Sequence, residues 1–331
     1  MHLLMILAAL VLAWWLRSGW QQSTGNWSQR WQRALLFFLL PPLLLMMTAI
    51  AVLFMGPQGK MMGLGTSWFS YWLVIAGVGI CLCFCLKLAI EAWQFLQQVR
   101  TYPQIELKNG EWTISEETRQ EAEPTPKPSK EGNRRQKGRG FDLFVPFVSG
   151  GKRRHNGNSS TTARLLENPT LFIAQIGFWQ PELLVSQGLL HKLQPEHLDA
   201  VLRHEQAHHY YRDTFWFFWL GWVRSCSAWL PNTESLWQEL LLLREIRADS
   251  WAAKRVDPLL VAESLLMVVS ASVTPSANFS AAFNCAVLRN RLQERIDTLL
   301  EEVDYPTPSS IWTWIWVILA LLPMATVPFH G

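Results

Sequence analysis

The sequence predicts a membrane protein in which about four helical spans accompany an α+β domain built on a small sheet. Half of its 331 residues are hydrophobic, and its 19 tryptophans and 17 phenylalanines are unevenly distributed. Several apolar runs approach or exceed the roughly 20 residues that a helix needs to cross a bilayer. Between these runs lie short alternating stretches bounded by turn residues, which are typical of strands, and segments with helical periodicity. Together these observations predict membrane helices and a folded domain.

Composition argues against two other classes of protein. The formal net charge is only +3, and the lysines and arginines fall mostly in loops, so direct nucleic-acid binding is not predicted. Three of the five cysteines, Cys81, Cys83 and Cys85, lie within one apolar run and form neither a C-x-x-C pair nor a disulfide framework. We expect them to act as small apolar residues in the membrane.

The first two predicted spans cover residues 3–16 and 34–55. The first run is uncharged and is followed, not preceded, by the basic residue Arg17, which favours an uncleaved span with the N-terminus outside over a signal peptide. The second contains Pro41-Pro42, a kink that neighbouring helices can accommodate in a membrane.

The third predicted span, 69–93, completes a membrane region over residues 1–100. It carries Lys87, which can reach the interface or pair with Glu91 one turn later. The loop 17–33 has three arginines and no acid, whereas the loop 56–68 has one lysine. This asymmetry predicts that the loop 17–33 and everything after the third span lie in the cytoplasm.

A juxtamembrane hairpin and a flexible insert are predicted next. In residues 101–115, two strand-like stretches flank Asn109-Gly110, the signature of a two-residue turn. Residues 116–165 are basic and rich in proline and contain few apolar side chains, so they cannot offset the entropy lost on ordering.

The folded domain is expected over residues 166–303. Strands are predicted at 171–177 and 183–186, and Pro195 suits the first position of a long helix. Residues 214–230 resemble a span by hydropathy but contain a charged arginine. We expect this run to continue the preceding helix, packed on the core or lying in the bilayer interface, without crossing.

The motif His204-Glu205-Gln206-Ala207-His208 is an H-E-x-x-H signature on that long helix. Residues four apart share a helix face, so both imidazoles can bind one metal ion while Glu205 lies beside them. This is the outline of a zinc peptidase site. The alternative, two solvated histidines, remains open because so short a motif also occurs by accident.

A third ligand is predicted on a downstream helix that begins after Asn232. Glu245 and Asp249 are four apart beside an apolar stripe, and charges facing a packed surface are costly unless paired or bound to metal. We therefore interpret Glu245 as the third zinc ligand and Asp249, with Asp213 as a further candidate, as an acceptor for a ligand imidazole N–H. The alternative is an amphipathic surface helix on which these acids are solvated.

Three stretches resemble the BlaR/MecR-type integral-membrane metallopeptidases, metallopeptidase family 56. They are Pro181 to Leu190, Val201 to His208 and Arg244 to Asp249, and the similarity extends over about Pro169 to Leu300. The resemblance implies a zincin-like fold with one zinc ion held by His204, His208 and Glu245, and Glu205 as catalytic base. It also implies a prokaryotic plasma membrane and a protein substrate, either a transcriptional repressor or the enzyme itself.

Two departures keep alternatives open. Ala248 stands where antirepressor members often carry cysteine, and the same stretch is similar to the HtpX-like family 48 quality-control peptidases. The chain ends after a last predicted span, 311–329, so we expect no extracellular sensor for beta-lactams. A silent signalling scaffold is the third reading, although a structural metal site would not require Glu205.

The sequence does not determine where the substrate binds or which residue stabilises the oxyanion. The predicted strands between 171 and 186 could add an extended substrate at an edge. A group that stabilises the oxyanion could be any of four residues. These are Tyr210, Tyr211, Arg289 and His209. The oligomeric state is not determined by the sequence.

Overall fold

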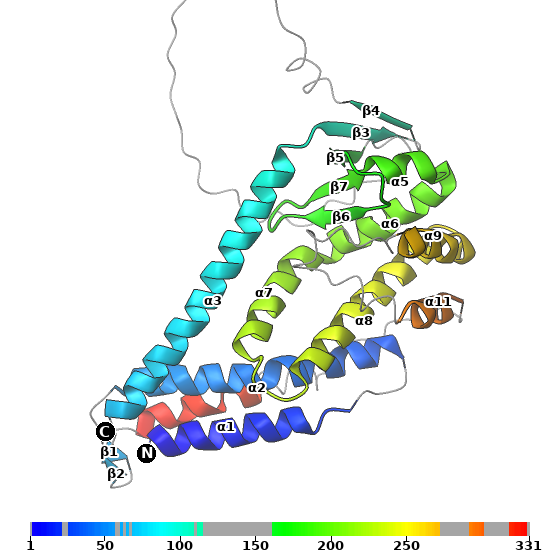
Figure 1. Cartoon of the computed structure of the whole chain (residues 1–331). Helices are drawn as coiled ribbons and strands as arrows, with labels where there is room; N and C mark the ends of the chain where they lie inside the picture. The colour runs from blue at the N-terminus through cyan, green and yellow to red at the C-terminus, as the bar shows by residue number, and fades with distance from the viewer. Residues whose placement is uncertain are drawn as a thin grey trace, which may run out of the picture.

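The described part of the protein is mostly helical, with two helices long and apolar enough to cross a membrane and a five-stranded mixed sheet. The computed structural model describes residues 2–21, 26–56, 60–61, 64–65, 68–108, 111–114, 161–271, 291–300 and 318–329. Figure 1 shows the N-terminal helices at one end of the molecule and the sheet at the other, with a group of helices joining them.

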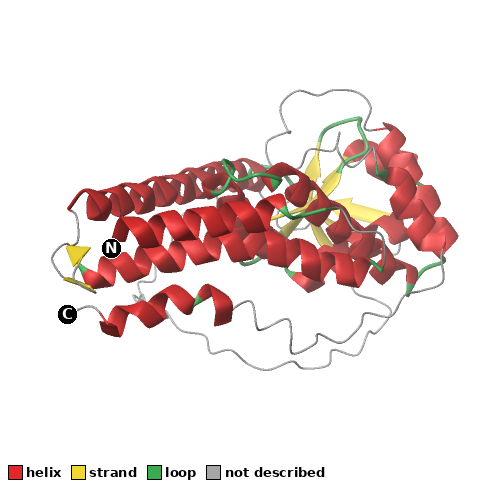
Figure 2. Ribbon diagram, turned by 90° about the horizontal axis from the view of Figure 1, so that it is seen from below, coloured by secondary structure: helices red, strands yellow, loops and turns green. Residues whose placement is uncertain are grey.

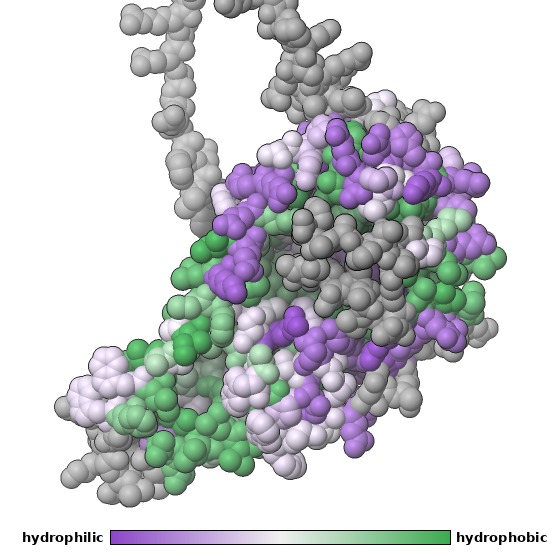
Figure 3. All heavy atoms as spheres, in the orientation of Figure 1, coloured by the Kyte–Doolittle hydropathy of each residue, from purple (hydrophilic) through white to green (hydrophobic). Residues whose placement is uncertain are grey.

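Three N-terminal helices correspond to the predicted spans. Helix α1 covers His2–Ser18, α2 covers Trp27–Met55 and α3 covers Trp68–Arg100, with a two-residue strand pair, β1 (Lys60–Met61) and β2 (Leu64–Gly65), between the last two. Helices α2 and α3 meet the length and hydropathy of a span, whereas α1 is a shorter apolar helix. In Figure 3, hydrophobic side chains gather over the lower part of α3 and the adjoining N-terminal helices.

Details inside these helices follow the sequence prediction. Helix α2 continues through Pro41 and Pro42, because a proline ring removes one intrahelical hydrogen bond without unfolding a helix that is packed on its neighbours. On α3 the Lys87 ammonium lies 3.9 Å from the Glu91 carboxylate, as the four-residue spacing predicted.

The predicted basic loop at 17–33 is mostly helical instead. Arg17 is the last basic residue of α1, and its buried guanidinium donates to the carbonyl of Phe38 at 3.0 Å and to Thr233 Oγ1 at 3.3 Å. Arg30 and Arg33 lie within α2, which begins at Trp27. The prediction of a loop over 17–33 was wrong for most of its length, because α1 extends to Ser18 and α2 begins at Trp27.

One sheet contains all the longer strands, in the order β4-β3-β5-β7-β6. Its members are β3 (Gln104–Lys108), β4 (Glu111–Ile114), β5 (Thr161–Leu166), β6 (Ile173–Ile176) and β7 (Glu182–Ser186). The pair β5 and β7 is parallel, with Leu165 opposite Val185, and the other pairs are antiparallel. The predicted hairpins at 101–115 and 171–186 are both present in it.

Strand β5 corrects the expected insert. Residues 161–165 were assigned to a flexible segment, but they form the central strand, with Ala163 and Leu165 buried against Ile105 of β3. The juxtamembrane hairpin is therefore an edge of the domain sheet and not a separate unit. The rest of the insert, 116–160, lies outside the described residues.

The helical half of the domain follows the sheet. It consists of α5 (Gln187–Lys192), α6 (Pro195–Tyr211), α7 (Asp213–Cys226), α8 (Thr233–Ala253), α9 (Pro258–Ala271) and α11 (Leu292–Leu300). Helix α6 packs on the sheet through Leu198 and Val201, whereas α8 packs on α2 and α7 through Leu236 and Leu240. Figure 2 shows these helices beside the sheet when the molecule is viewed from below.

The sequence predicts that residues 214–230 continue α6, but the structure shows a separate helix there. The chain breaks at Arg212, whose φ of 55° is left-handed, and α7 starts at Asp213 in a new direction. Helix α7 runs beside α3, where the Trp222 indole N–H donates to the Cys81 carbonyl at 2.8 Å. Helix α8 then returns toward α6, so α7 and α8 form a hairpin (Figure 1).

The last predicted span, 311–329, is described only in part. Residues 318–320 are helical, and Leu322–Phe329 forms a 3-10 helix, η1, that packs along α2. The stretch from Leu322 contains Pro323 and Pro328, and proline interrupts the hydrogen bonds of a regular α-helix. Residues 311–317 lie outside the described part of the chain.

Candidate metal centre

Helix α6 carries both histidines of the motif. Pro195 occupies the first turn, where its missing N–H costs nothing, and Leu198 and Val201 pack in one core cluster with residues of the sheet. His204 and His208 lie one turn apart, and their rings meet edge to face with centroids 4.8 Å apart. Glu205 is buried on the same helix.

Helix α8 supplies the carboxylates that face these histidines. Glu245 and Asp249 lie one turn apart, and both are buried. The apolar residues Leu241, Leu242 and Ala248 beside them are buried as well. The surface-helix alternative is therefore wrong, because the acids point into the protein.

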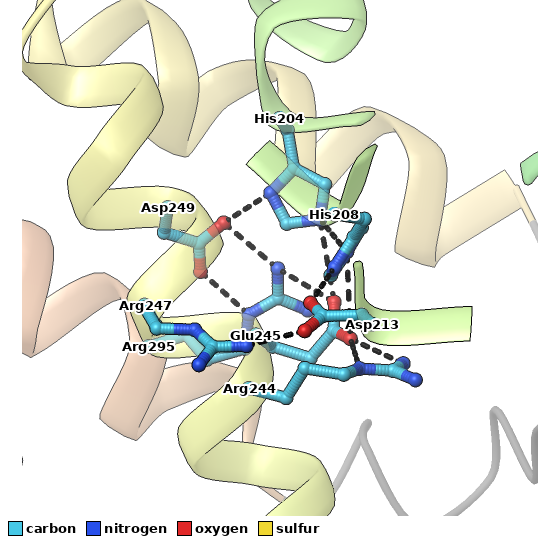
Figure 4. A network of polar contacts seen from close by, with 8 residues as sticks. All are labelled: His204, His208, Asp213, Arg244, Glu245, Arg247, Asp249 and Arg295. Atoms are coloured by element: carbon cyan, nitrogen blue, oxygen red, sulfur yellow. Dashed lines mark hydrogen bonds and ion pairs between the residues drawn. The ribbon is translucent and has the colours of Figure 1, made fainter. Parts of the chain in front are cut away.

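Three side chains converge closely enough to hold a metal ion (Figure 4). Nε2 of His204 lies 3.1 Å from Nε2 of His208 and 3.3 Å from Oε2 of Glu245, and Nε2 of His208 lies 3.8 Å from Oε1 of Glu245. Bonds of about 2.0–2.1 Å in a tetrahedral geometry put ligand atoms about 3.3 Å apart. Among the described residues, this is the one group of His, Cys, Asp or Glu side chains with that convergence.

The other nitrogen of each imidazole faces its own carboxylate. Nδ1 of His204 lies 2.8 Å from Oδ1 of Asp249, and Nδ1 of His208 lies 2.7 Å from Oδ2 of Asp213. A carboxylate assigns the proton to Nδ1, so the lone pairs of both Nε2 atoms point toward each other and toward Glu245. Such lone pairs repel unless a cation lies between them. The donor set therefore fits a metal ion, with a proton as its competitor.

Three arginines surround the acids. Arg295 of α11 donates to both oxygens of Asp249, at 2.7 and 2.9 Å, and lies 3.5 Å from Glu245. Arg244 donates to Oε1 of Glu245 at 2.5 and 2.9 Å, and Arg247 donates to Oδ1 of Asp213. Each acid that faces a histidine therefore has an arginine behind it (Figure 4).

These charges set the protonation of the site. Burial disfavours the charge of Glu245, but Arg244, His208, His204 and Arg295 outweigh it and hold the pKa of that carboxyl well below its usual range. Burial would raise the pKa of Asp249, but Arg295 and His204 outweigh burial and lower that pKa. Burial would lower the pKa of His204, yet Asp249 and Glu245 raise it to about 10. Both acids are therefore anionic. Without a metal ion, His204 is cationic, with a proton on each ring nitrogen.

The structure places the predicted residues as follows. His204, His208 and Glu245 meet, Asp249 and Asp213 accept from the two imidazoles, and Glu205 lies buried between the histidines in sequence. Of the four oxyanion candidates, the three that the structure describes do not join the metal centre in this way. His209 and Tyr210 are exposed, Tyr211 stacks on Arg247 with 4.1 Å from the guanidinium carbon to the ring centre, and Arg289 lies outside the described residues.

The arginines are what sequence reasoning missed. Arg244 and Arg247 flank Glu245 within one turn, and Arg295 lies on the closing helix, so their proximity to an acid was visible only for the first two. The carboxylates of Asp249, Glu245 and Glu205 raise the pKa of Arg295 although its burial opposes this. Arg295 therefore lies within electrostatic range of the proposed base.

Comparison with protein-family models, curated proteins and solved structures gives no match for this chain.

Proposed function

We propose that the protein is a membrane-embedded zinc endopeptidase, as its resemblance to the BlaR/MecR-type family implies. The observation that carries the proposal is the convergence of His204, His208 and Glu245 within 4.8 Å of one another, with Glu205 between the two histidines. A purely structural site needs the three ligands but has no use for a buried glutamate beside them. Their combination is what a hydrolase requires.

The three ligands would hold the zinc ion through Nε2 of each histidine and a carboxylate oxygen of Glu245. Zinc there would act as a Lewis acid that polarises a peptide carbonyl and makes water a better nucleophile near neutral pH. Asp249 and Asp213 keep Nδ1 of the two histidines protonated and so fix the orientation of both rings. Arg295 and Arg244 keep Glu245 anionic.

Glu205 is the proposed general base and acid. Its carboxylate accepts a proton as water attacks the peptide carbon and returns that proton to the leaving amine. Its burial excludes bulk water from this transfer. The edge strand β6, which packs beside α6, is the proposed position for an extended substrate.

The membrane setting rests on α2 and α3. Both satisfy the length and hydropathy of a span, and α3 is almost wholly exposed along its apolar length. Exposed apolar side chains over such a length are unfavourable in water and favourable in lipid. With α1 as a third, shorter span, we place the N-terminus outside and the metal centre on the cytoplasmic side of a plasma membrane. The proposed substrate is a repressor or the enzyme itself.

The testing experiment compares the wild type with Glu205→Gln in the intact membrane protein. Zinc content is measured by mass spectrometry on protein in nanodiscs, and new N-termini are identified by proteomics of cells that express each form. We expect Glu205→Gln to retain zinc and to lower cleavage by about 10²- to 10⁴-fold, because the transferred proton has no acceptor. Its matched control is His209→Gln, an exposed histidine on the same helix.

The outcomes separate the alternatives. Identical sets of N-termini in wild type and Glu205→Gln, with zinc bound in both, would support a silent scaffold and overturn the enzyme. Loss of cleavage of many unrelated membrane proteins would point to an HtpX-like quality-control role. Loss of one product, from a repressor or from this chain, is the result that the proposal expects.

A further inference from the structure

We propose that α2, a candidate membrane span, positions the metal centre through two adjacent residues, Arg30 and Trp31, so that movement of α2 changes the affinity of the site for its metal. The inference rests on the proposed metal site. It assigns a positioning role to residues 170 or more positions away from the motif along the chain and provides a route from the membrane to the site.

The Trp31 route passes through one arginine and one aspartate. The guanidinium carbon of Arg247 lies 4.7 Å from the Trp31 ring centre and 4.1 Å from the Tyr211 ring centre, so Arg247 is stacked between α2 and α6. The same guanidinium donates to Oδ1 of Asp213, whose other oxygen faces Nδ1 of His208. The orientation of His208 is therefore linked to α2 by contiguous contacts.

The Arg30 route reaches the other ligands. Its guanidinium donates to Oε1 of Glu239 at 2.6 and 2.9 Å and to Oε1 of Glu294 at 2.5 Å. Glu239 lies on α8, less than two turns before Glu245. Glu294 immediately precedes Arg295, which holds Asp249 and, through it, His204. Arg30 thus joins α2 to both helices that support the acidic side of the site.

The contact of Arg30 with Glu239 is shielded from water, whereas the Glu294 side chain is 34% exposed. The Glu239 contact is therefore the firmer link between α2 and the site. Arg30 is 12% exposed and Glu239 is 3% exposed, and charged groups in a low dielectric tolerate little displacement from their partners. The same face of α2 packs on α8 through Phe38, whose ring lies 6.2 Å from that of Trp237. Helix α2 cannot shift along α8 without disturbing at least one of the two routes.

The test measures metal affinity, which a role in folding alone would not change. Zinc dissociation constants of Trp31→Leu and Arg30→Ala are determined by chelator competition on the full chain in nanodiscs. Leucine keeps the apolar bulk of Trp31 but removes the ring face. We expect each variant to weaken zinc binding by about tenfold, the lower end of the loss seen when a partner behind a ligand is removed.

Conservative variants and a double-mutant cycle distinguish the routes. Trp31→Phe and Arg30→Lys should recover part of the affinity. The effect of Trp31→Leu should vanish in an Asp213→Asn background, because both act on His208, whereas the effect of Arg30→Ala should persist there. Arg33→Ala, at an exposed arginine of α2, and Trp93→Ala, at an exposed tryptophan of α3, are the matched controls.

Two results would overturn the inference. One is zinc affinity within twofold of wild type in both Trp31→Leu and Arg30→Ala. The other is an equal loss in Arg33→Ala or Trp93→Ala, which would show a general effect of altering the helices. If the variants fail to fold, Trp31→Phe and Arg30→Lys decide by the same criterion. Absence of zinc from the wild type itself would instead refute the proposed function.

Discussion

Each histidine of the metal centre is held by an aspartate and an arginine, and we call each such pair an arm. The two arms have the same residue types but lie against different helices. In the first arm, His204 faces Asp249, which Arg295 holds with two hydrogen bonds. In the second arm, His208 faces Asp213, and Arg247 donates to that acid while stacked between two aromatic rings. The first arm ends on α11 and reaches α2 only through the contact of Glu294 with Arg30, whereas the second ends directly on Trp31 of α2.

The two arms differ in the burial of their arginines and not in that of their acids. Arg295 is 5% exposed and Arg247 15%, whereas Asp249 and Asp213 are 2% and 4% exposed. A deeply buried pair with two bonds is costly to break, since each charge is left without water or partner. A stacked arginine retains its contacts with the rings when its acid is lost. The same pattern of residues therefore gives one arm held by a deeply buried pair with two hydrogen bonds and one arm that rests directly on another helix.

The largest effect is expected where both arms meet. Glu245→Gln should reduce zinc affinity by more than 100-fold, beyond the 10- to 100-fold loss that follows removal of a partner behind a ligand. Chelator competition measures this. Glu263→Gln, at an acid of α9 that lies 3.4 Å from His197 near the start of α6, is the control and should leave zinc affinity unchanged. Retention of wild-type affinity in Glu245→Gln would remove it from the ligand set.

The next effect separates the arms. Asp249→Asn should lower the free energy of unfolding by about 3–5 kcal/mol, because it leaves the buried Arg295 without its partner. Asp213→Asn should cost about 1–3 kcal/mol, since Arg247 keeps its aromatic neighbours. Thermal and chemical unfolding of the zinc-free protein compare the two. An equal or larger cost for Asp213→Asn would contradict this distinction between the two arms.

A smaller effect concerns pH and belongs to the first arm. The pKa of His204 is raised to about 10, above its unfolded value near 6.5. Its protonation therefore stabilises the zinc-free fold fully below about pH 6.5, and this stability is lost as pH rises through 10. Zinc requires the neutral imidazole, so binding between these limits should release about one proton and strengthen by up to tenfold per pH unit.

Calorimetry in two buffers of different ionisation enthalpy counts the released protons. His204→Ala, which has no imidazole at that position, should abolish most of this release. Zinc binding at pH 8 without proton release would show that the proximity of Asp249 and Glu245 does not protonate His204 in the metal-free state.

The smallest effect is expected outside both arms. Lys87 and Glu91 form a pair on α3 with side chains 73% and 57% exposed. Lys87→Ala should change the free energy of unfolding by less than about 0.5 kcal/mol and leave zinc affinity as it is. The unfolding assay used for Asp249→Asn provides the scale. A loss comparable to that of Asp213→Asn would mean that burial does not rank these ion pairs.

Local sequence patterns predicted much of the fold. The apolar runs of α2 and α3, the alternation on either side of Asn109-Gly110 and the proline that starts α6 are signals within a few residues. Strand β5 carries no such signal, because it follows a long polar stretch and its partners in β3 and β7 are distant in sequence. Its existence depends on pairing that a single segment does not encode.

The candidate site divides in the same way. Helical spacing predicted the two histidines, and a charged pair beside an apolar stripe predicted Glu245 and Asp249. Arg30 could not be predicted, since its acid partner Glu239 is 209 positions away. Tertiary packing determines that contact. Local sequence spacing therefore predicted the candidate metal ligands, but it could not predict the distant residues that hold them in position.

The left-handed turn at Arg212 has a consequence for how this motif can vary in length. On an uninterrupted helix, residues five apart differ by about 140° in direction, so Asp213 would point away from His208. The turn cancels this angle and lets the first residue of α7 reach the imidazole. Adding or deleting a single residue between Tyr211 and Asp213 would therefore put the aspartate out of phase with the histidine while leaving the five-residue motif intact.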